Sequence, residues 1–474
     1  MKIVLVSLNK SGSEDMLPLG LVTLATYLKA YLDPRIDVDI LDGNREEDVL
    51  SKVISVNPDI IGLSAMTINY SDVIEFAKKI KSKIKTHILV GGVHISTLPN
   101  CLDKVFDAGV IGEAEKTFFE LINHYKKYKN LKNIDKINGI AFFKNDKLIF
   151  TPRRELIQNL DEIPIPDRSL VDTDYYFREG LVPNGEIKIR TSVLTSRGCP
   201  FVCNFCSTSY FWQITRFNSA ERVVEEIQYL NREFGVNHIN LWDDLFTINT
   251  SRIESIIKEL DEVGLLGEIS FSCQGRTDIF NEELCKLLKR LNVLDIGFGF
   301  ESGNTRVLNF LKKGRIKLED HHRAILLCEK YGFSLSGSLI FGAPTETIEE
   351  MKDTLKLIDF MIEHNAENIW SFVMTPFPGT EIWQIAKERG KVNEEKMDWK
   401  LLSHQNLENP LLLDENIDRE EFKKVFLEGR KKLTYFRRKK IKRDIRNNFG
   451  LFVKKIVTNP RRAIAVALNR HITE

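Results

Sequence analysis

Three cysteines stand within eight residues of a chain that has only seven cysteines in all. They are Cys199, Cys203 and Cys206, in the segment "TSRGCPFVCNFCSTS" that runs from Thr195 to Ser209. A structural zinc site would need a fourth ligand nearby, and a catalytic dithiol would leave the third cysteine unused. A cubane iron–sulfur cluster has four irons, so three thiolates leave one iron open to bind and activate a ligand. The spacing favours such a cluster, with these cysteines as its ligands.

The alternatives fit less well with the residues around the three thiols. His238 and Cys273 are the nearest candidates for a fourth zinc ligand, but they lie on later predicted strands without a paired spacing. Three buried structural cysteines are disfavoured because Gly198, Pro200 and Asn204 mark an irregular loop. Tight clustering of soft ligands is hard to explain by packing alone.

The composition is that of an ordinary soluble globular protein. The 474 residues are 43% hydrophobic and 28% charged, and this length predicts two or three domains. No run approaches the ~20 apolar residues of a membrane-spanning helix, and the first apolar run is too short for a signal peptide. An odd number of cysteines, spread over a long chain, does not suggest a disulfide framework. We therefore expect a protein of the reducing cytoplasm.

The first part of the chain alternates apolar strands with helical stretches, a pattern typical of a parallel sheet covered on both faces. The strand candidates are "KIVLVSL", "DVDILDG", "DIIGLSAMT", "HILVGGVH" and "DAGVIGE". The C-terminal edge of such a sheet binds flat or phosphate-bearing ligands, although a tight turn also explains Gly91-Gly92. Residues 1–135 are predicted to form a doubly wound domain. A linker over residues 136–187 follows, with hairpin character at Asn145-Asp146.

From Lys188 the alternation resumes with a longer period. Six strand candidates separated by helical segments predict a partial (β/α)6 barrel over residues 188–395, so the fold class is α/β. The cysteines follow the first of these strands, at the C-terminal face where barrel enzymes assemble their chemistry. Asn218 and Glu221 predict a capping box for the next helix. Residues 396–474 form the C-terminal region.

The spacing C-x-x-x-C-x-x-C on the first loop of a predicted barrel resembles the signature of the radical S-adenosylmethionine superfamily. "LWDDLFT", "GFGFESG", "GSLIFGAPTET" and "MTPFPGTEIW" resemble strand-end motifs of the branch that carries a cobalamin-binding domain ahead of the barrel. "PLGLVTLATYLK", "GGVH" and "VIGEAE" resemble recurring segments of that domain. The resemblance spans residues 1–395 and implies three cofactors: a [4Fe–4S] cluster, S-adenosylmethionine and cobalamin.

The resemblance also implies roles for residues outside the cysteine motif. In this superfamily the open iron chelates S-adenosylmethionine, and one electron splits it to methionine and a 5′-deoxyadenosyl radical. By position, Phe205 presents its backbone near the adenine, and Asp243 or Asp244 holds the amino group of S-adenosylmethionine. Arg276 binds the carboxylate of S-adenosylmethionine, and Glu301 accepts hydrogen bonds from its ribose hydroxyls. Helix capping or ion pairing is the structural alternative for the charged residues.

For cobalamin binding, the resemblance points to Gly91, Gly92 and His94 at the sheet edge. Many cobalamin enzymes carry an Asp-x-His-x-x-Gly loop after the first strand, whose His is the lower cobalt ligand. Here that loop reads "NKSGSEDMLPLG" and has no His, so it cannot ligate cobalt through imidazole. We expect His94 to cap a turn or to contact the cobalamin tail, not to ligate the metal.

The function that the resemblance implies is methylation of an unactivated carbon, by way of a 5′-deoxyadenosyl radical and methylcobalamin. The alternatives are radical cyclisation, rearrangement or oxidation with the same cofactors, a radical enzyme without cobalamin, and a non-enzymatic binding protein on a degenerate scaffold. A methylthiotransferase would need three more cysteines in its first domain, and residues 1–198 hold only Cys101. An external electron donor of the flavodoxin or ferredoxin type is the expected partner.

The C-terminal end of the chain is strongly basic. Residues 430–474 hold 15 Lys and Arg against two acids, a net charge of +13, and the rest of the chain carries −12. Such a tail can lie on an anionic membrane, bind nucleic acid or pack as a solvated helix over the barrel. Among the functional readings we prefer the membrane, because Phe449, Phe452 and Val453 belong to an apolar stripe. A cytoplasmic enzyme, peripheral to the inner membrane surface and acting on a lipid or other small molecule, is the resulting expectation.

Overall fold

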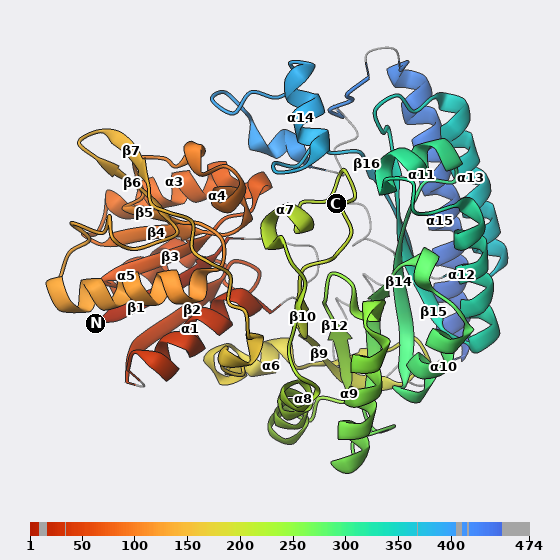
Figure 1. Cartoon of the computed structure of the whole chain (residues 1–474), viewed down its shortest axis with the longest axis horizontal. Coiled ribbons are helices and arrows are strands. Elements are labelled where there is room, and N and C mark those ends of the chain that lie inside the picture. Colours follow the sequence, from red (N-terminus) through yellow and green to blue (C-terminus); the bar gives the residue numbers. More distant parts are fainter. Residues whose placement is uncertain (9–16, 34, 367, 404–409, 415–416, 448–474) are drawn as a thin grey trace. The chain divides into compact units, whose positions relative to one another are not determined.

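The computed structural model describes residues 1–8, 17–33, 35–366, 368–403, 410–414 and 417–447, with side chains as far as residue 439. The chain forms two compact units (Figure 1). Unit 1 consists of Met1–Phe177, Ser196–Arg222 and Thr375–Leu411. Unit 2 consists of Arg178–Thr195, Val223–Met374 and Leu412–Glu474.

Unit 1 is built on a seven-stranded sheet with the order β2-β1-β3-β4-β5-β6-β7, in which β1 to β5 are parallel. The strands are β1 (Lys2–Ser7), β2 (Asp37–Asp42), β3 (Ile60–Ser64), β4 (His87–Gly91), β5 (Ala108–Val110), β6 (Ile140–Lys144) and β7 (Lys147–Phe150). Four consecutive residues of β1, from Ile3 to Val6, are at most 1% exposed, so both faces of the sheet are covered. The strand order reverses between β1 and β3, which is the switch point where such sheets bind ligands. The predicted doubly wound sheet is confirmed.

Helices of unit 1 pack in pairs, α1 against α5 and α2 against α3. The unit contains α1 (Leu19–Tyr31), α2 (Val49–Val56), α3 (Tyr70–Lys81), α4 (Val93–Thr97), α5 (Ala114–Tyr128), α6 (Thr173–Tyr176), α7 (Thr208–Trp212) and α14 (Glu381–Glu388), with short 3-10 turns η1 (Thr67–Asn69), η2 (Pro99–Cys101), η3 (Leu160–Glu162), η4 (Arg168–Leu170) and η7 (Trp399–Leu402). The hairpin at Asn145-Asp146 is confirmed: φ is 50° and 61° at these two residues, the left-handed pair that a tight hairpin turn requires. The hairpin β6-β7 extends the sheet beside β5.

Unit 2 is built on a second seven-stranded sheet, with the order β16-β15-β14-β13-β12-β9-β8. Six strands are parallel and β8 is antiparallel. The strands are β8 (Glu179–Leu181), β9 (Ile187–Val193), β12 (His238–Leu241), β13 (Ser270–Gly275), β14 (Val293–Glu301), β15 (Ser334–Phe341) and β16 (Asn368–Val373). Six parallel strands linked through helices are the predicted partial barrel, which is therefore confirmed.

The helices associated with this sheet are α8 (Ala220–Phe234), α9 (Thr250–Glu262), α10 (Glu282–Arg290), α11 (Thr305–Lys312), α12 (Leu318–Tyr331), α13 (Ile348–Glu363) and α15 (Arg419–Asn447), with turns η5 (Phe246–Ile248) and η6 (Thr277–Ile279). The expected capping box at the start of α8 is wrong. Ser219 caps this helix by accepting from the backbone N–H of Arg222 at 3.1 Å. Asn218 instead donates to the carboxylate of Asp161 at 3.0 Å, a partner far away in the sequence.

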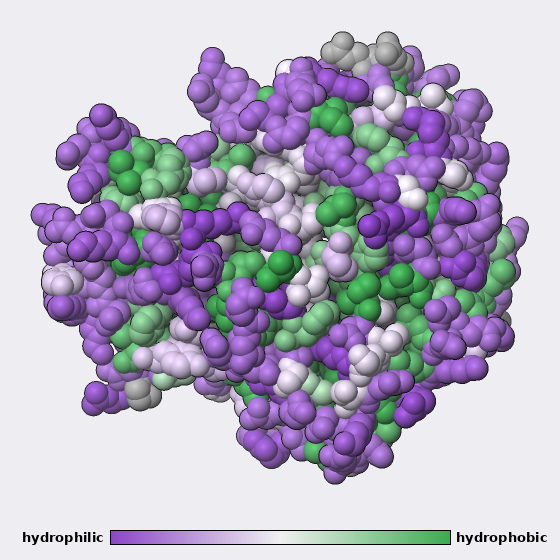
Figure 2. Space-filling view, in the orientation of Figure 1, coloured by the Kyte–Doolittle hydropathy of each residue, from purple (hydrophilic) through white to green (hydrophobic). Residues whose placement is uncertain are grey.

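The first part of the basic tail belongs to α15, which packs on α13 and β16. Phe422 and Phe426 are at most 1% exposed, Lys432 pairs with Asp359 at 2.6 Å, and the guanidinium of Arg437 lies 4.5 Å from the ring of Trp370. The apolar stripe at residues 445–456 lies outside the described side chains, so membrane contact stays a prediction. None of the described helices combines the length and the apolarity that crossing a membrane requires. The surface seen in Figure 2 is mostly hydrophilic, with smaller apolar areas.

Candidate active site

The three cysteines lie on a loop of unit 1 that a short antiparallel sheet closes. β10 (Ser196–Arg197) pairs with β11 (Arg216–Phe217), and the loop between them carries α7. Gly198 adopts φ +95°, and a Cβ there would lie 2.4 Å from the carbonyl oxygen of Ile214. Glycine is therefore required where the loop begins. We refer to residues 198–215 as the cysteine loop.

Cys199, Cys203 and Cys206 are each half-buried. Among the residues that the structure describes, no three His, Cys, Asp or Glu side chains converge as the ligands of a metal ion would. The structure places the three thiols on one loop of unit 1. Three half-buried soft donors on one loop fit a cluster that is assembled on the protein.

Other candidate ligands are engaged elsewhere. His238 lies between two serine hydroxyls, with Nδ1 2.9 Å from Ser270 and Nε2 3.1 Å from Ser272. Burial lowers its pKa to about 4. Burial also raises the pKa of the thiols of Cys273 and Cys328, which disfavours the thiolate that binds a metal. The structure therefore offers no fourth ligand from these residues.

A segment from far along the chain contacts the middle of the cysteine loop within unit 1. The backbone N–H of Ile382 donates to the carbonyl of Asn204 at 3.1 Å. Gly379 has φ +82°, and a Cβ there would lie 2.8 Å from the ring of Tyr210. No local pattern in the sequence predicts these contacts, because they join residues more than a hundred positions apart.

In unit 2, the two aspartates after β12 have different environments. Asp243 is 1% exposed, and its carboxylate accepts two hydrogen bonds of 2.6 Å, from the backbone N–H and the hydroxyl of Thr195. Arg252 donates to the carbonyl of Thr195 at 2.7 Å. Asp244 is exposed. Asp243 thus fixes the chain just after β9, and Asp244 is the carboxylate that a ligand can reach.

Arg276 and Glu301 each form a buried ion pair. Arg276 is 7% exposed, and its Nε lies 2.8 Å from a carboxylate oxygen of Asp278. Oε1 of Glu301 accepts from Nζ of Lys312 at 2.8 Å, and Oε2 lies 3.4 Å from the hydroxyl of Ser338. Ion pairing, which was the alternative to a binding role, is therefore present at both positions. The contacts of Arg276 and Glu301 with S-adenosylmethionine stay a prediction.

The backbone around Glu301 is strained. Its φ is +63°, in the left-handed region that residues other than glycine rarely adopt. The register between β14 and β15 shifts between Gly299 and Glu301. A Cβ at Gly299 would lie 2.2 Å from Oε1 of Glu301, so this glycine makes room for the carboxylate itself and not for a ligand. Strained residues of this kind are concentrated at functional sites.

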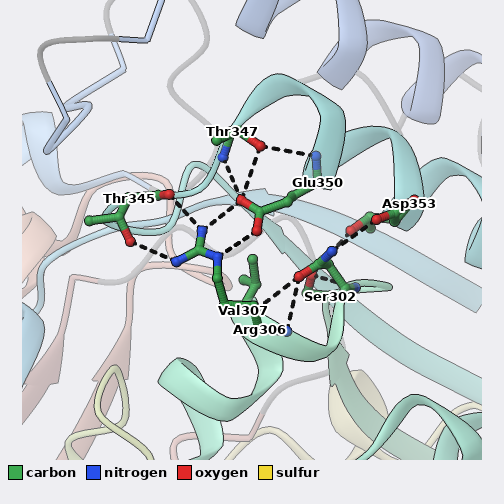
Figure 3. Close-up of polar contacts among 9 residues, drawn as sticks. Ser302, Arg306, Val307, Thr345, Thr347, Glu350 and Asp353 are labelled. Atoms are coloured by element: carbon green, nitrogen blue, oxygen red, sulfur yellow. Dashed lines mark hydrogen bonds and ion pairs between the residues drawn. The ribbon is translucent and has the colours of Figure 1, made fainter.

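Figure 3 shows a polar network that joins the loops after β14 and β15 and that the sequence analysis did not predict. Arg306 donates to both carboxylate oxygens of Glu350, at 2.5 and 2.6 Å, and to the carbonyl and hydroxyl of Thr345, at 2.6 and 3.0 Å. Thr347 and Glu350 form a capping box at the start of α13. The hydrogen bond from Arg306 is the main cause that lowers the pKa of Glu350 to about 2. The spacing of Thr347 and Glu350, which is typical of a capping box, was the signal in the sequence that could have pointed to part of this network.

Glu346 is a buried carboxyl group in the turn that follows β15. It belongs to the segment "GSLIFGAPTET", but it was not among the predicted site residues. Its Oε2 accepts from the backbone N–H groups of Gly342 and Ala343, at 2.7 and 3.0 Å. Oε1 has no hydrogen-bond partner among the described residues. Burial raises the pKa of Glu346 to about 7, although the two N–H bonds act in the opposite direction. The carboxyl group closes the turn that follows the strand.

At the C-terminal edge of the unit 1 sheet, the backbone demands glycine at one of the two predicted positions. Gly92 has φ +102°, and a Cβ there would lie 2.6 Å from the carbonyl oxygen of Ala65. At Gly91, a Cβ would come no closer than 3.7 Å to Val110, an ordinary contact. The turn therefore explains Gly92, which lies at the edge formed by the carboxyl ends of the parallel strands.

His94 lies inside unit 1, fully buried. Its ring centroid is 4.0 Å from that of Tyr70 and 4.6 Å from that of Trp399, and Nδ1 lies 3.4 Å from the hydroxyl of Thr67. Burial lowers its pKa to about 3, so the imidazole is neutral. Nε2 has no hydrogen-bond partner among the described residues. Contact between His94 and the cobalamin tail stays a prediction.

The sequence matches two family models, the radical SAM superfamily over residues 193–358 and the B12-binding domain over residues 7–122. A protein of Pyrococcus horikoshii named as an uncharacterized methyltransferase is 36% identical over 380 residues, which cover 78% of this chain and 78% of that protein. The chain belongs to the radical SAM superfamily. Within it, the B12-binding domain places the chain in the cobalamin-dependent branch.

This radical SAM protein is similar to other enzymes along most of its length. An anaerobic magnesium-protoporphyrin IX monomethyl ester cyclase of Rubrivivax gelatinosus is 28% identical over 418 residues, covering 85% of this chain and 71% of the cyclase. The radical S-adenosylmethionine methyltransferase TsrM of Kitasatospora setae, solved with tryptophan and an S-adenosylmethionine analogue, has 21% identity and a TM-score of 0.68. The match covers 82% of this chain and 76% of TsrM, and it shows a shared fold.

The cofactors of this radical SAM enzyme are a [4Fe–4S] cluster, S-adenosylmethionine and cobalamin. Residues of unit 1 fit the cluster and cobalamin. The cysteine loop offers three thiols for a cluster. Sheets of this kind bind ligands at the carboxyl ends of their parallel strands, and Gly91 and Gly92 lie at that edge of the unit 1 sheet, at the end of β4.

Proposed function

We propose that the enzyme transfers a methyl group from S-adenosylmethionine, through cobalamin, to an unactivated carbon of a small-molecule or lipid substrate. The observation that carries this proposal is the 36% identity, over 78% of the chain, to a protein named as a methyltransferase. When bound, the cluster supplies the electron that cleaves S-adenosylmethionine, and cobalamin carries the methyl group. A flavodoxin or ferredoxin serves as the electron donor.

In this proposal, Cys199, Cys203 and Cys206 hold three irons and leave the fourth for S-adenosylmethionine. Asp244 binds the amino group of that molecule, because it is exposed at the end of β12. Asp243 acts indirectly, since both of its oxygens are taken by the chain that leads into the cysteine loop.

Arg276, Glu301 and the backbone of Phe205 complete the binding of S-adenosylmethionine in this proposal. Asp278 holds Nε of Arg276, and Lys312 holds Oε1 of Glu301. An ion pair on one edge of a planar group fixes the direction of its other edge, which then binds the carboxylate or the ribose without further loss of side-chain freedom.

Cobalamin binds, in this proposal, at the edge formed by Gly91 and Gly92. His94 supports the turn from inside the unit, with its backbone N–H 3.3 Å from the carbonyl oxygen of Ala65. The loop after β1 has no His, so this loop would supply no imidazole ligand to cobalamin.

A second candidate function is a radical reaction without methyl transfer, such as cyclisation or oxidation. The observation that favours it is the 28% identity, over 85% of the chain, to an anaerobic cyclase. Both candidates share the cofactors and the site, and they differ in which products of S-adenosylmethionine accumulate.

The deciding experiment is anaerobic reconstitution with iron, sulfide and hydroxocobalamin, followed by metal analysis and product quantification under strong reductant. Transfer of the methyl group to cobalamin releases S-adenosylhomocysteine, whereas radical cleavage releases 5′-deoxyadenosine. We expect about four irons and one cobalt per chain, and both products. Cys199→Ala should abolish 5′-deoxyadenosine formation, because the variant lacks one ligand of the cluster that binds and cleaves S-adenosylmethionine. Cys101→Ala, a half-buried cysteine of the same unit, is the matched control.

Two outcomes would contradict methylation. Bound cobalt with 5′-deoxyadenosine but no S-adenosylhomocysteine would favour the non-methylating reaction. Four irons without any cobalt would leave a radical enzyme whose first domain has another task.

A further inference from the structure

Four charged side chains of unit 1 form a buried cluster to which the roles above assign nothing. Arg197 donates to Glu113 at 2.7 Å and to Glu115 at 2.5 Å, and Arg216 donates to Glu113 at 3.0 Å. The side chains of Glu113, Glu115 and Arg216 are 4–7% exposed, and that of Arg197 is 16% exposed. The two positive and two negative charges balance one another.

The two arginines bracket the cysteine loop. Arg197 and Arg216 are cross-strand neighbours of β10 and β11, so they occupy the two ends of the loop that carries the thiols. The position of these two arginines determines the position of the loop, because only Gly198 separates Arg197 from the first cysteine.

The two glutamates belong to the edge where cobalamin is proposed to bind. Glu113 is the N-cap residue of α5 and Glu115 lies in its first turn, directly after β5. The turn before them is held by a 2.9 Å hydrogen bond from the N–H of Gly112 to the hydroxyl of Ser96 on α4. Helix α4 follows Gly92, so the glutamates are tied to the turn that contains Gly92.

Further contacts fix the directions of these side chains. The backbone N–H of Ile157 donates to Glu113 at 2.7 Å, and Nη1 of Arg216 donates to the carbonyl of Ile157 at 2.6 Å. The guanidinium groups of Arg197 and Arg216 lie 5.4 and 5.7 Å from the ring centroid of Trp212. Trp212 ends α7 within the cysteine loop, so both arginines hold the loop by its interior as well as by its ends.

Charges buried in this way contribute more to position than to stability. Apolar side chains of the same volume often stabilise a fold as well as a buried ion pair does, because desolvation offsets the attraction. A guanidinium instead fixes its partners in direction as well as in distance. Burial opposes ionisation of Glu113, but the hydrogen bond from Arg216 and the charge of Arg197 outweigh it and lower its pKa. Glu113 is therefore ionised at neutral pH.

We propose that Glu113, Glu115, Arg197 and Arg216 are a positioning clamp, which fixes the cysteine loop and its iron–sulfur cluster against the cobalamin-binding edge of the unit 1 sheet. The rate of group transfer between separately bound molecules depends steeply on their separation and orientation. A clamp that fixes the cluster relative to cobalamin would therefore favour the reaction. The inference rests on the proposed function, in that the cluster is bound by the loop and cobalamin by this edge.

The test compares the full chain with two clamp variants. Glu115→Gln removes one charge and keeps the shape of the side chain, and Arg197→Lys keeps the charge but loses the two-pronged contact. Glu120→Gln is the matched control, because it removes a carboxylate of the same helix, which pairs with Arg154 at 2.6 Å outside the clamp. One readout is amide hydrogen exchange of residues 198–215 before reconstitution. The other is the dipolar coupling between the unpaired spins of the reduced cluster and of cobalt(II) after reconstitution.

We expect exchange in residues 198–215 to be about tenfold faster in both clamp variants, with iron and cobalt contents unchanged. The dipolar coupling should weaken or spread over a wider range, because it falls with the cube of the distance. Glu120→Gln should change neither readout. Unchanged exchange in the clamp variants would overturn the proposal. Faster exchange with an unchanged coupling would also overturn it, since the residues would then serve the fold alone. A wild-type enzyme that takes up no cobalt would refute the proposed function, and exchange would still decide whether the loop is clamped.

Discussion

Glu346 should make the stability of this enzyme fall as the pH rises. Its pKa in the folded protein is about 7, raised by burial from an ordinary value of 4.5. The folded chain therefore holds the proton more tightly than the unfolded chain does. The stability that this proton contributes is fully present below pH 4.5 and is lost as the pH rises through about 7. At about 1.36 kcal/mol for each pH unit between the two values, the loss amounts to roughly 3 kcal/mol.

The substitution Glu346→Gln isolates this effect. An amide oxygen can still accept from the N–H groups of Gly342 and Ala343, and the side chain carries no charge at any pH. The assay is urea unfolding of the full chain, wild type and variant, in steps between pH 5 and pH 8.5. We expect the free energy of unfolding of the variant, relative to that of the wild type, to rise by roughly 3 kcal/mol between pH 5 and pH 8.5.

Glu350→Gln is the control with the opposite sign. Arg306 holds the pKa of Glu350 at about 2, so Glu350 is ionised over the whole assay range. Its loss should destabilise the protein by a constant amount between pH 5 and pH 8.5. If the difference between wild type and Glu346→Gln were equally constant, Glu346 would not be protonated in the folded protein, and the reasoning would be wrong.

Three glycine substitutions test the backbone that shapes the site. Gly92→Ala places a Cβ 2.6 Å from the carbonyl oxygen of Ala65 at φ +102°, and should destabilise the protein by about 2 kcal/mol or more, whereas Gly91→Ala should be nearly neutral. Equal melting temperatures for these two variants would contradict the steric argument. Gly299→Ala places a Cβ 2.2 Å from Oε1 of Glu301 and should raise the KM for S-adenosylmethionine about tenfold, measured by 5′-deoxyadenosine formation. An unchanged KM would remove Glu301 from the binding site.

Much of the fold could be predicted because its signals are local. Strands buried on both faces are continuous apolar runs, so β1, β3 and β4 of the unit 1 sheet were visible in the sequence. The turn at Asn145-Asp146 was visible because these two residue types tolerate a left-handed backbone. The cysteine motif was visible because ligands of one cluster lie a few residues apart on one loop.

The functional roles of the charged residues could not be predicted in the same way. Asp243 and Asp244 are adjacent in the sequence, and burial against Thr195 distinguishes them. Asn218 was expected to cap α8, but a carboxylate from a distant segment, Asp161, takes its side chain. A side chain's role depends on what lies opposite it, and for these residues the neighbour comes from another part of the chain.

By itself, the sequence determined the two sheets, the three thiols on one loop and the family of the enzyme, since each depends on residues that are close together in the chain. Tertiary structure alone decided which carboxylates stay accessible and how the cysteine loop is held. The contacts between Arg197 and Glu113, and between Ile382 and Asn204, join segments that no local pattern connects. The physical reason is that periodicity and turn chemistry act over a few residues, whereas burial and ion pairing depend on the whole folded chain.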